Sequence, residues 1–218
     1  MNYVGLSKYD TANGPGVRVS LFVSGCRLHC RGCFNEESWD FSAGKPFTDE
    51  TLEEILKALD SKWIAGFSLL GGDPFEPEHE ATLVKLLEAI RARFPEKTIW
   101  AWTGRTVEKV EKSPLLPLID MLVDGPFVEK LKTEKQGAWR GSVNQRIIPL
   151  VAGRVDLSPE GGRRQSAPKQ STERNEKSVK KQAQSAAKGA ARASGPAALC
   201  FGQLSAIFCC KARFSQKK

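Results

Sequence analysis

Short apolar runs alternate with amphipathic helical patterns through the first 150 residues, and this alternation constrains the fold more than any other feature. The runs that read as strands are residues 17–24, 66–70, 98–102 and 119–123. They are short, bounded by turn residues and rich in β-branched, aromatic and other apolar side chains. Strands that are separated by helices pair in parallel through right-handed crossovers. The pattern therefore predicts an α/β body, either an open sheet or an incomplete barrel.

Two amphipathic helices are expected between these strands. The first begins after Thr48, a good N-cap that is followed by Asp49 and Glu50 in the first turn, and it runs to about Leu59. The second spans residues 79–94, where large apolar side chains recur at spacings of three and four. In either architecture the active site lies at the carboxyl ends of the parallel strands. The loops that follow the predicted strands are therefore where chemistry is expected.

The composition changes abruptly after Ile148, where aromatic and large aliphatic residues become rare. Residues 1–150 carry 19 Lys and Arg against 21 Asp and Glu, whereas residues 151–218 carry 14 against 4. The net charge of +8 thus arises in the last third and says nothing about what the body binds. Such a segment cannot bury enough apolar area to offset its ordering entropy. We expect one folded domain over 1–150 and a disordered basic tail over 151–218, either a solvated or non-native appendage or an arm for an acidic partner.

No apolar run approaches the length of a membrane-spanning helix. The opening sequence MNYVGLSKYD has no basic start followed by an apolar stretch, so no secretory signal is expected. These observations predict a cytoplasmic protein that does not associate with a membrane.

Three of the six cysteines, Cys26, Cys30 and Cys33, lie within eight residues directly after the first predicted strand. A disulfide framework is not expected, because the group is odd in number and a core of this size needs no covalent staples. Structural zinc sites usually have four ligands, and His29, the only nearby candidate, sits directly beside Cys30. Three thiolates without an obvious fourth ligand favour a 4Fe–4S cluster with one open iron. Zinc and inert thiols stay open on spacing alone.

The pattern C-x3-C-x2-C after the first strand of an α/β body resembles the signature of the radical S-adenosylmethionine enzymes. A second motif agrees: Gly71-Gly72-Asp73-Pro74 follows a predicted strand and resembles that family's glycine-rich loop, which meets the methionyl amino group. Glycines let the backbone approach a ligand closely, and a nearby carboxylate suits an ammonium group. Alone this tetrapeptide would indicate an ordinary turn, and the cysteine triplet is what makes it specific.

Further stretches resemble the activating proteins of class III anaerobic ribonucleoside-triphosphate reductases. They are residues 13–16 (NGPG), 32–35 (GCFN), 99–104 (IWAWTG), 123–127 (VDGPF) and 139–146 (WRGSVNQR). The resemblance covers residues 1 to about 148. The long C-terminal arm departs from the family, whose members normally end soon after the W-R-G-S-x-N-Q segment. Phe34 departs from the tyrosine that is common at that position.

This resemblance implies an incomplete TIM-type barrel of parallel strands with outer helices. It also implies that Cys26, Cys30 and Cys33 hold a 4Fe–4S cluster whose open iron is chelated by S-adenosylmethionine. One electron from a flavodoxin-like donor would then give methionine and a 5′-deoxyadenosyl radical. That radical would abstract a hydrogen atom from a glycine in the large subunit of the anaerobic reductase.

The same resemblance implies the cofactor contacts. Gly32, Cys33 and Phe34 are expected on the adenine side of S-adenosylmethionine, and Gly71, Gly72 and Asp73 at its methionyl end. Thr103 and Gly104 are weaker candidates. Trp100 and Trp102 share one sheet face, where core packing is favoured over a binding role. The segment Trp139–Arg146 is either a docking surface for the partner or a plain chain end.

Two rival functions remain. One is another small radical enzyme, of the pyruvate formate-lyase activator or 7-carboxy-7-deazaguanine synthase type. The other is a non-enzymatic zinc or cluster module whose basic tail binds nucleic acid in a salt-sensitive manner. Because the body itself carries no excess of basic residues, nucleic acid is not the expected partner.

Overall fold

The computed structural model describes residues 1–135 and 137–156. In this part of the chain eight strands form one sheet in the order β3-β1-β2-β4-β5-β6-β7-β8. The strands are β1 (Asn2–Asp10), β2 (Val17–Val23), β3 (Lys45–Pro46), β4 (Ile64–Gly71), β5 (Thr98–Trp102), β6 (Met121–Asp124), β7 (Arg146–Val151) and β8 (Arg154–Val155). The helices are α1 (Asp49–Leu59), α2 (Glu80–Arg93) and α3 (Val107–Val110), with 3-10 turns η1 (Glu36–Ser38), η2 (Pro77–His79), η3 (Leu116–Leu118) and η4 (Glu129–Leu131).

The centre of the sheet is parallel and its flanks are antiparallel. Strands β2, β4, β5 and β6 pair in parallel and in chain order. On one side β1 pairs antiparallel with β2, and on the other β7 pairs antiparallel with β6. The prediction of an α/β body with parallel strands is confirmed. The sheet is open, and its relation to a TIM-type barrel stays a prediction.

The start of the first predicted helix is determined by the residues next to it in the sequence. Helix α1 spans Asp49–Leu59, as the sequence indicates. Thr48 is its N-cap, and its hydroxyl accepts a hydrogen bond from the Thr51 backbone N–H at 3.4 Å. The Thr51 hydroxyl in turn accepts from the Thr48 N–H, which completes a capping box. The four predicted strands and the second predicted helix are also present, with ends that shift by at most two residues.

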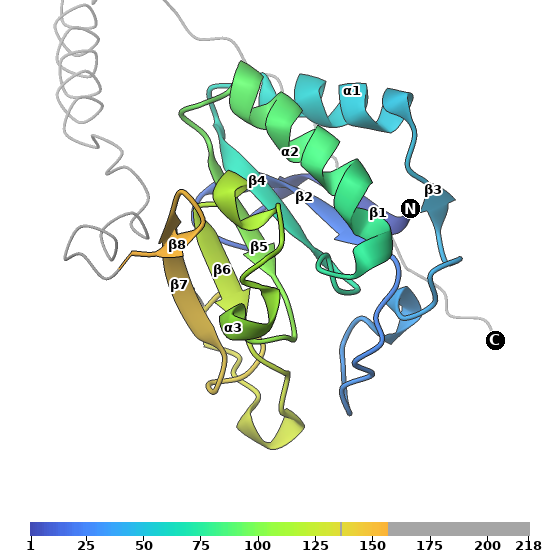
Figure 1. Ribbon diagram of the computed structural model, residues 1–218, viewed down its shortest axis with the longest axis vertical. Helices are drawn as coiled ribbons and strands as arrows, with labels where there is room; N and C mark the ends of the chain where they lie inside the picture. The colour runs from blue at the N-terminus through green and yellow to red at the C-terminus, as the bar shows by residue number, and fades with distance from the viewer. Residues whose placement is uncertain (136, 157–218) are drawn as a thin grey trace, which may run out of the picture. The chain divides into compact units, whose positions relative to one another are not determined.

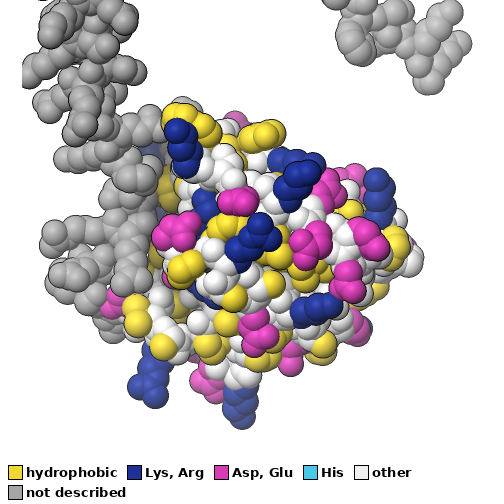
Figure 2. All heavy atoms as spheres, turned by 90° about the horizontal axis from the view of Figure 1, so that it is seen from above, with side chains coloured by type: hydrophobic (Ala, Val, Ile, Leu, Met, Phe, Trp, Pro, Cys, Tyr) yellow, Lys and Arg dark blue, Asp and Glu magenta, His cyan; other side chains and the backbone are white. Residues whose placement is uncertain are grey.

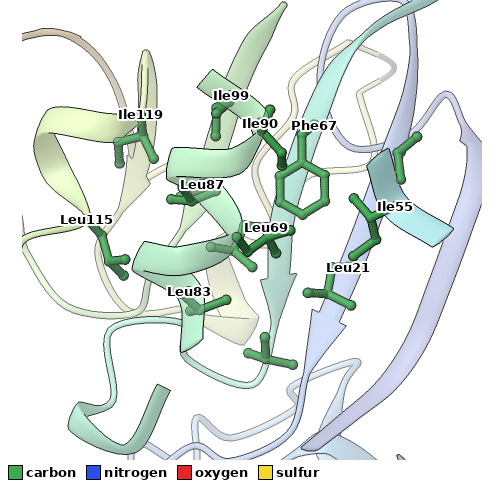
Figure 3. Close-up of a cluster of buried hydrophobic side chains, with 14 of the residues drawn as sticks. Leu21, Ile55, Phe67, Leu69, Leu83, Leu87, Ile90, Ile99, Leu115 and Ile119 are labelled. Atoms are coloured by element: carbon green, nitrogen blue, oxygen red, sulfur yellow. The ribbon is translucent and has the colours of Figure 1, made fainter. Parts of the chain in front are cut away.

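Helices α1 and α2 cover one face of the parallel strands (Figure 1). In Figure 3 the side chains of Leu83, Leu87 and Ile90 on α2 point toward Phe67 and Leu69 of β4. All five side chains have no exposed surface. This helix-side core is held by the burial of apolar area, at about 1.5–3 kcal/mol for each large side chain.

The opposite face of the same strands buries polar side chains beside a small apolar cluster of Trp100, Met121 and Val123. Arg18 of β2 has no exposed surface, and its guanidinium donates to the Ser68 hydroxyl at 2.7 Å. It also donates to the backbone carbonyls of Phe67 at 2.7 Å and Thr98 at 2.8 Å. These bonds join β2, β4 and β5 near the starts of the strands. This part of the face is therefore filled by a hydrogen-bonded network.

The flanking strands were not predicted from the sequence. In β1 most residues are only half-buried, and Gly5 interrupts its apolar pattern. Strand β7 contains Pro149, which argues against a strand when it is judged by propensity alone. Through β7 and β8 the ordered backbone runs past the composition break at Ile148 to Val155. The tertiary pairing with β6 thus overrides the local signals.

The expected disordered tail lies outside the described residues except for its first six positions, and so do Cys200, Cys209 and Cys210. The division into a domain over 1–150 and a tail over 151–218 stays a prediction. Within the part that the structure describes, no helix is long and apolar enough to cross a membrane. On the face shown in Figure 2, basic and acidic side chains are interspersed, in keeping with the balanced charge of the body.

Candidate functional site

A cavity of about 760 Å³ lies at the carboxyl ends of β2, β4 and β5. The loops after these strands supply its wall, together with the segment that precedes β7. Among the residues that line it are Cys26, Cys30, Cys33, Phe34, Gly71, Gly72, Trp102, Thr103, Gly104 and Trp139. Most of the side chains that the sequence singled out are thus brought to one space, although they come from segments up to about a hundred residues apart.

The cysteine loop follows β2 and folds back on itself. Gly25 has a φ of +109°, which a side chain would strain, and its N–H donates to the Ser38 carbonyl at 2.7 Å. The Cys26 N–H donates to the Trp39 carbonyl at 3.0 Å. Cys26 is buried, and burial raises the pKa of its thiol. Cys30 and Cys33 are half-buried, and all three thiols are free.

The donor set of this loop fits an iron–sulfur cluster. Three soft thiol ligands from one loop face one cavity, and in such a cluster each thiolate binds a different iron. Within residues 1–135 and 137–156, no three His, Cys, Asp or Glu side chains are placed to hold one metal ion. His29 does not line the cavity, and its ring stacks on Trp39 with centroids 4.5 Å apart.

The glycine loop after β4 packs directly on the cysteine loop. The Gly72 N–H donates to the Val23 carbonyl at 2.7 Å, and the Asp73 N–H donates to the Gly25 carbonyl at 2.8 Å. A Cβ atom on Gly72 would lie 2.4 Å from the Gly25 carbonyl oxygen. Gly71 has a φ of +111°, which only glycine adopts readily. The two glycines therefore let the loops touch while their backbone lines the cavity.

Asp73 and Gly32 are the two predicted contacts that do not line the cavity. The Asp73 side chain is 1% exposed and accepts from the Thr103 hydroxyl at 2.9 Å and the Phe75 N–H at 3.0 Å. Burial raises the pKa of the Asp73 carboxyl group. A Cβ on Gly32 would lie 2.9 Å from Cδ of Glu129, so Gly32 faces the turn η4. The structure thus places these two residues behind the cavity wall.

Sequence reasoning missed an ion-pair network that links the loops after β2, β4 and β5. Glu76, with 1% exposed surface, accepts from the Arg27 N–H at 3.0 Å and the Arg27 guanidinium at 2.7 Å. It also accepts from the Arg105 guanidinium at 2.8 Å. Burial raises the pKa of Glu76, but these hydrogen bonds outweigh it and hold the pKa below its ordinary value. The partners lie 29 and 49 residues away, so no local pattern could have identified them.

Trp102 and Trp139 line the cavity, and Trp100 packs behind them. Trp100 has no exposed surface, and its ring centroid lies 5.7 Å from that of Trp102 and 5.5 Å from that of Trp139. The Trp102 indole N–H donates to the Trp139 carbonyl at 2.9 Å. Trp100 and Trp102 share one sheet face as predicted. Trp100 packs in the core, whereas Trp102 also lines the cavity.

The segment Trp139–Arg146 folds around Gln145. The Gln145 side-chain oxygen accepts from the Gly141 N–H at 2.8 Å and the Ser142 N–H at 3.1 Å, and its amide donates to the Gly125 carbonyl at 2.9 Å. These bonds connect the segment to the loop after β6. Because Trp139, Arg140 and Gly141 line the cavity, this segment is part of the site.

Comparisons with known proteins match this body. A family described as "4Fe-4S single cluster domain" matches residues 12–148. The anaerobic ribonucleoside-triphosphate reductase-activating protein of Enterobacteria phage T4 is 42% identical over 147 residues, which are 67% of this chain and 93% of that protein. The protein of the same name from Escherichia coli (strain K12) is 42% identical over 154 residues, 69% of this chain and 99% of that protein. That of Vibrio cholerae is 41% identical over 151 residues, 67% of this chain and 97% of its own length.

Proposed function

The chain belongs to the family of anaerobic ribonucleoside-triphosphate reductase-activating proteins, and on this premise we propose how its residues support activation of the reductase. It is a radical S-adenosylmethionine activating enzyme with a 4Fe–4S cluster. The observation that carries this function is that all three cysteines of the C-x3-C-x2-C loop line one cavity with the glycine loop. Because the chain belongs to this family, activation of the reductase is favoured over the two rival functions, another small radical enzyme and a non-enzymatic zinc or cluster module.

Cys26, Cys30 and Cys33 are the residues that would hold the cluster. When bound and reduced by an external donor, the cluster would supply the one electron needed to cleave S-adenosylmethionine to methionine and a 5′-deoxyadenosyl radical, the species that would take a hydrogen atom from a glycine of the reductase. The chain itself contributes position and enclosure. The buried Cys26 lies at the base of the loop, and the hydrogen bonds of Gly25 and Cys26 to Ser38 and Trp39 keep this base in place.

The proposed cofactor contacts follow the cavity wall. The backbone of Gly71 and Gly72 would meet the methionyl end, and Cys33 and Phe34 the adenine side. Phe34 is 71% exposed at the cavity, so its ring is free to pack over adenine.

Gly32 and Asp73 are proposed to act through their neighbours. Gly32, with a φ of +70°, turns the chain before Cys33. Asp73 holds the hydroxyl of Thr103, which lines the cavity beside Gly104. Their role is to keep the contacting residues in position.

The parallel strands support the proposal of a partial TIM-type barrel. Strands β2, β4, β5 and β6 are neighbours in chain order, and α1 and α2 lie on one face of them while the cavity occupies the other. A doubly wound sheet would instead have helices on both faces. We propose residues 1–150 as the activating domain and 151–218 as an appended tail, because the relatives are matched over nearly their whole length by about two thirds of this chain.

The proposed partners are the large subunit of the anaerobic reductase and a flavodoxin-like electron donor. Nucleic acid is not proposed as a partner, because the charges of the body are balanced. The names of the relatives specify the reductase. Cytoplasmic localisation is proposed because closely spaced cysteines that bind a metal cluster, and do not form disulfides, are typical of reducing compartments.

The test is anaerobic reconstitution with iron and sulfide, followed by dithionite and S-adenosylmethionine. We expect 5′-deoxyadenosine to form, and a glycyl-radical signal to appear by electron paramagnetic resonance when the reductase is added. Cys26→Ala should reduce both to background. A chain that binds zinc in place of iron and yields no 5′-deoxyadenosine would overturn the proposal.

A further inference from the structure

The glycine loop is joined to the cysteine loop by a buried carboxylate as well as by backbone bonds. Glu76 accepts two hydrogen bonds from Arg27, one from its N–H at 3.0 Å and one from its guanidinium at 2.7 Å. Arg27 directly follows the cluster ligand Cys26. The Glu76 carboxylate has only 1% of its surface exposed, so its oxygens depend on these protein donors, although the Arg27 side chain is itself 55% exposed. The position of Cys26 is thus coupled to Glu76, which lies two positions after Pro74, the last residue of the glycine loop.

Arg105 extends this coupling to the loop after β5. Its guanidinium donates to Glu76 at 2.8 Å and to the Phe75 carbonyl at 2.8 Å, and it lies 3.9 Å from the Asp73 carboxylate. The Arg105 N–H donates to the Thr103 hydroxyl at 3.1 Å, and that hydroxyl bonds Asp73. Two arginines and two buried carboxylates therefore connect the loops after β2, β4 and β5.

Stability alone does not account for such an arrangement. A buried ion pair is often no more stabilising than apolar residues of the same volume, because desolvation offsets its attraction. What a satisfied network does impose is one geometry, since a shift of either arginine removes hydrogen bonds from the buried Glu76 carboxylate. In a reaction between two bound groups, a displacement of about 1 Å can cost about 100-fold in rate.

We propose that Glu76 is a positioning residue for the reductive cleavage of S-adenosylmethionine. By holding Arg27 and Arg105 together, it sets the cysteine loop, and with it the cluster, at a fixed distance from the cofactor-binding glycine loop. This inference rests on the proposed function of the cysteine and glycine loops.

The test compares Glu76→Gln with Glu78→Gln in the reconstituted full-length protein. Each removes one carboxylate charge beside Arg27, but Glu78 is 48% exposed and bonds neither Arg105 nor the Arg27 backbone. Glu76→Gln should retain its iron and sulfide content yet form 5′-deoxyadenosine roughly 10- to 100-fold more slowly at saturating S-adenosylmethionine. The change that S-adenosylmethionine causes in the paramagnetic resonance spectrum of the reduced cluster should also shrink. Glu78→Gln should match the wild type within about twofold, as expected for an exposed pair.

A second variant distinguishes the effect of loop geometry from the effect of charge near the cluster. It also provides a test if Glu76→Gln fails to load a cluster. Arg105→Lys keeps the positive charge but loses the planar fork that bonds Glu76 and Phe75 together. It should slow cleavage without shifting the midpoint potential of the cluster, whereas Glu76→Gln should also raise that potential. Wild-type cleavage rates and spectra in either variant would overturn the inference. Failure of the wild type to cleave S-adenosylmethionine would instead refute the proposed function.

Discussion

The two faces of the parallel sheet are equally buried and chemically different. On the helix side Leu21, Leu69 and Ile99 pack against α1 and α2 (Figure 3), and on the cavity side Arg18 and Ser68 are just as inaccessible. Apolar packing is non-directional, so the helix side needs only the right volume and pattern. Hydrogen-bonded groups need particular partners at particular distances. The helix side thus contributes most of the stability. The cavity side contributes less stability, but it holds polar groups in a fixed arrangement.

The largest loss of stability should follow the removal of a buried apolar side chain on the helix side. Leu87→Ala removes a fully buried side chain of α2 and should lower the free energy of unfolding by about 2–5 kcal/mol, measured by urea denaturation of the cluster-free protein. Leu87→Met conserves volume and should cost less than about 1.5 kcal/mol. The affinity of the folded protein for S-adenosylmethionine should stay at the wild-type value. A matching fall in affinity would show that the two faces are not independent.

A smaller effect is expected from the polar side. The Ser68 hydroxyl accepts from Arg18 at 2.7 Å and donates to the Asn13 carbonyl at 2.6 Å. Ser68→Ala leaves a guanidinium N–H buried without a partner and should cost about 1–3 kcal/mol in the same denaturation experiment. Thr98→Val removes another acceptor of Arg18, at 3.0 Å. Because both partners serve one group, the double variant should be non-additive, and strict additivity would contradict a shared network.

A change in the cavity wall should affect ligand binding more than stability, whereas a change on the helix side should affect stability alone. Trp102→Phe removes the indole N–H that donates to the Trp139 carbonyl and should cost about 0.5–1.5 kcal/mol. Because Trp102 lines the cavity, the affinity for S-adenosylmethionine should fall, as measured by calorimetry. Trp63→Phe is the matched control, since Trp63 is 72% exposed and lies outside the cavity wall. Equal effects of the two changes would remove the special role of Trp102.

The smallest effect concerns His79, which lies between the helix layer and the cysteine loop. It is 1% exposed, its ring lies 5.7 Å from that of Phe41, and burial lowers its pKa below the ordinary 6.5. The folded protein therefore keeps His79 neutral at a pH where the unfolded chain is protonated. The free energy of unfolding should decline as the pH falls below about 6.5 and level off below the folded-state pKa. His79→Gln should remove this component, and an unchanged slope would assign it to other groups.

Much of the fold could be predicted because its signals are local. The N-cap at Thr48, the helical spacing of Leu83, Leu87 and Ile90, and the apolar run at 98–102 each specify an element from neighbouring residues alone. The antiparallel β1 and β7 could not be predicted, because Gly5 and Pro149 weaken their patterns and pairing with β2 and β6 compensates.

The site likewise has features that local sequence predicts and features that depend on tertiary structure. The spacing of Cys26, Cys30 and Cys33 is a property of one loop, so the sequence by itself determined the family and predicted these three cysteines as the cluster ligands. It also predicted that Gly71 and Gly72 meet the ligand, and both line the cavity, where Gly71 ends β4 and Gly72 follows it. Only the tertiary structure decided that the Asp73 carboxylate bonds Thr103 behind the wall.

The tertiary structure likewise decided that Glu76 joins Arg27 to Arg105, and that Trp139 closes the cavity over Trp102. These partners lie 29 to 49 residues apart in the chain. They meet because parallel strands bring their carboxyl ends to one edge of the sheet. The spacing of residues along the chain therefore predicts which side chains belong to one loop. Only the packing of the strands determines which loops lie next to one another.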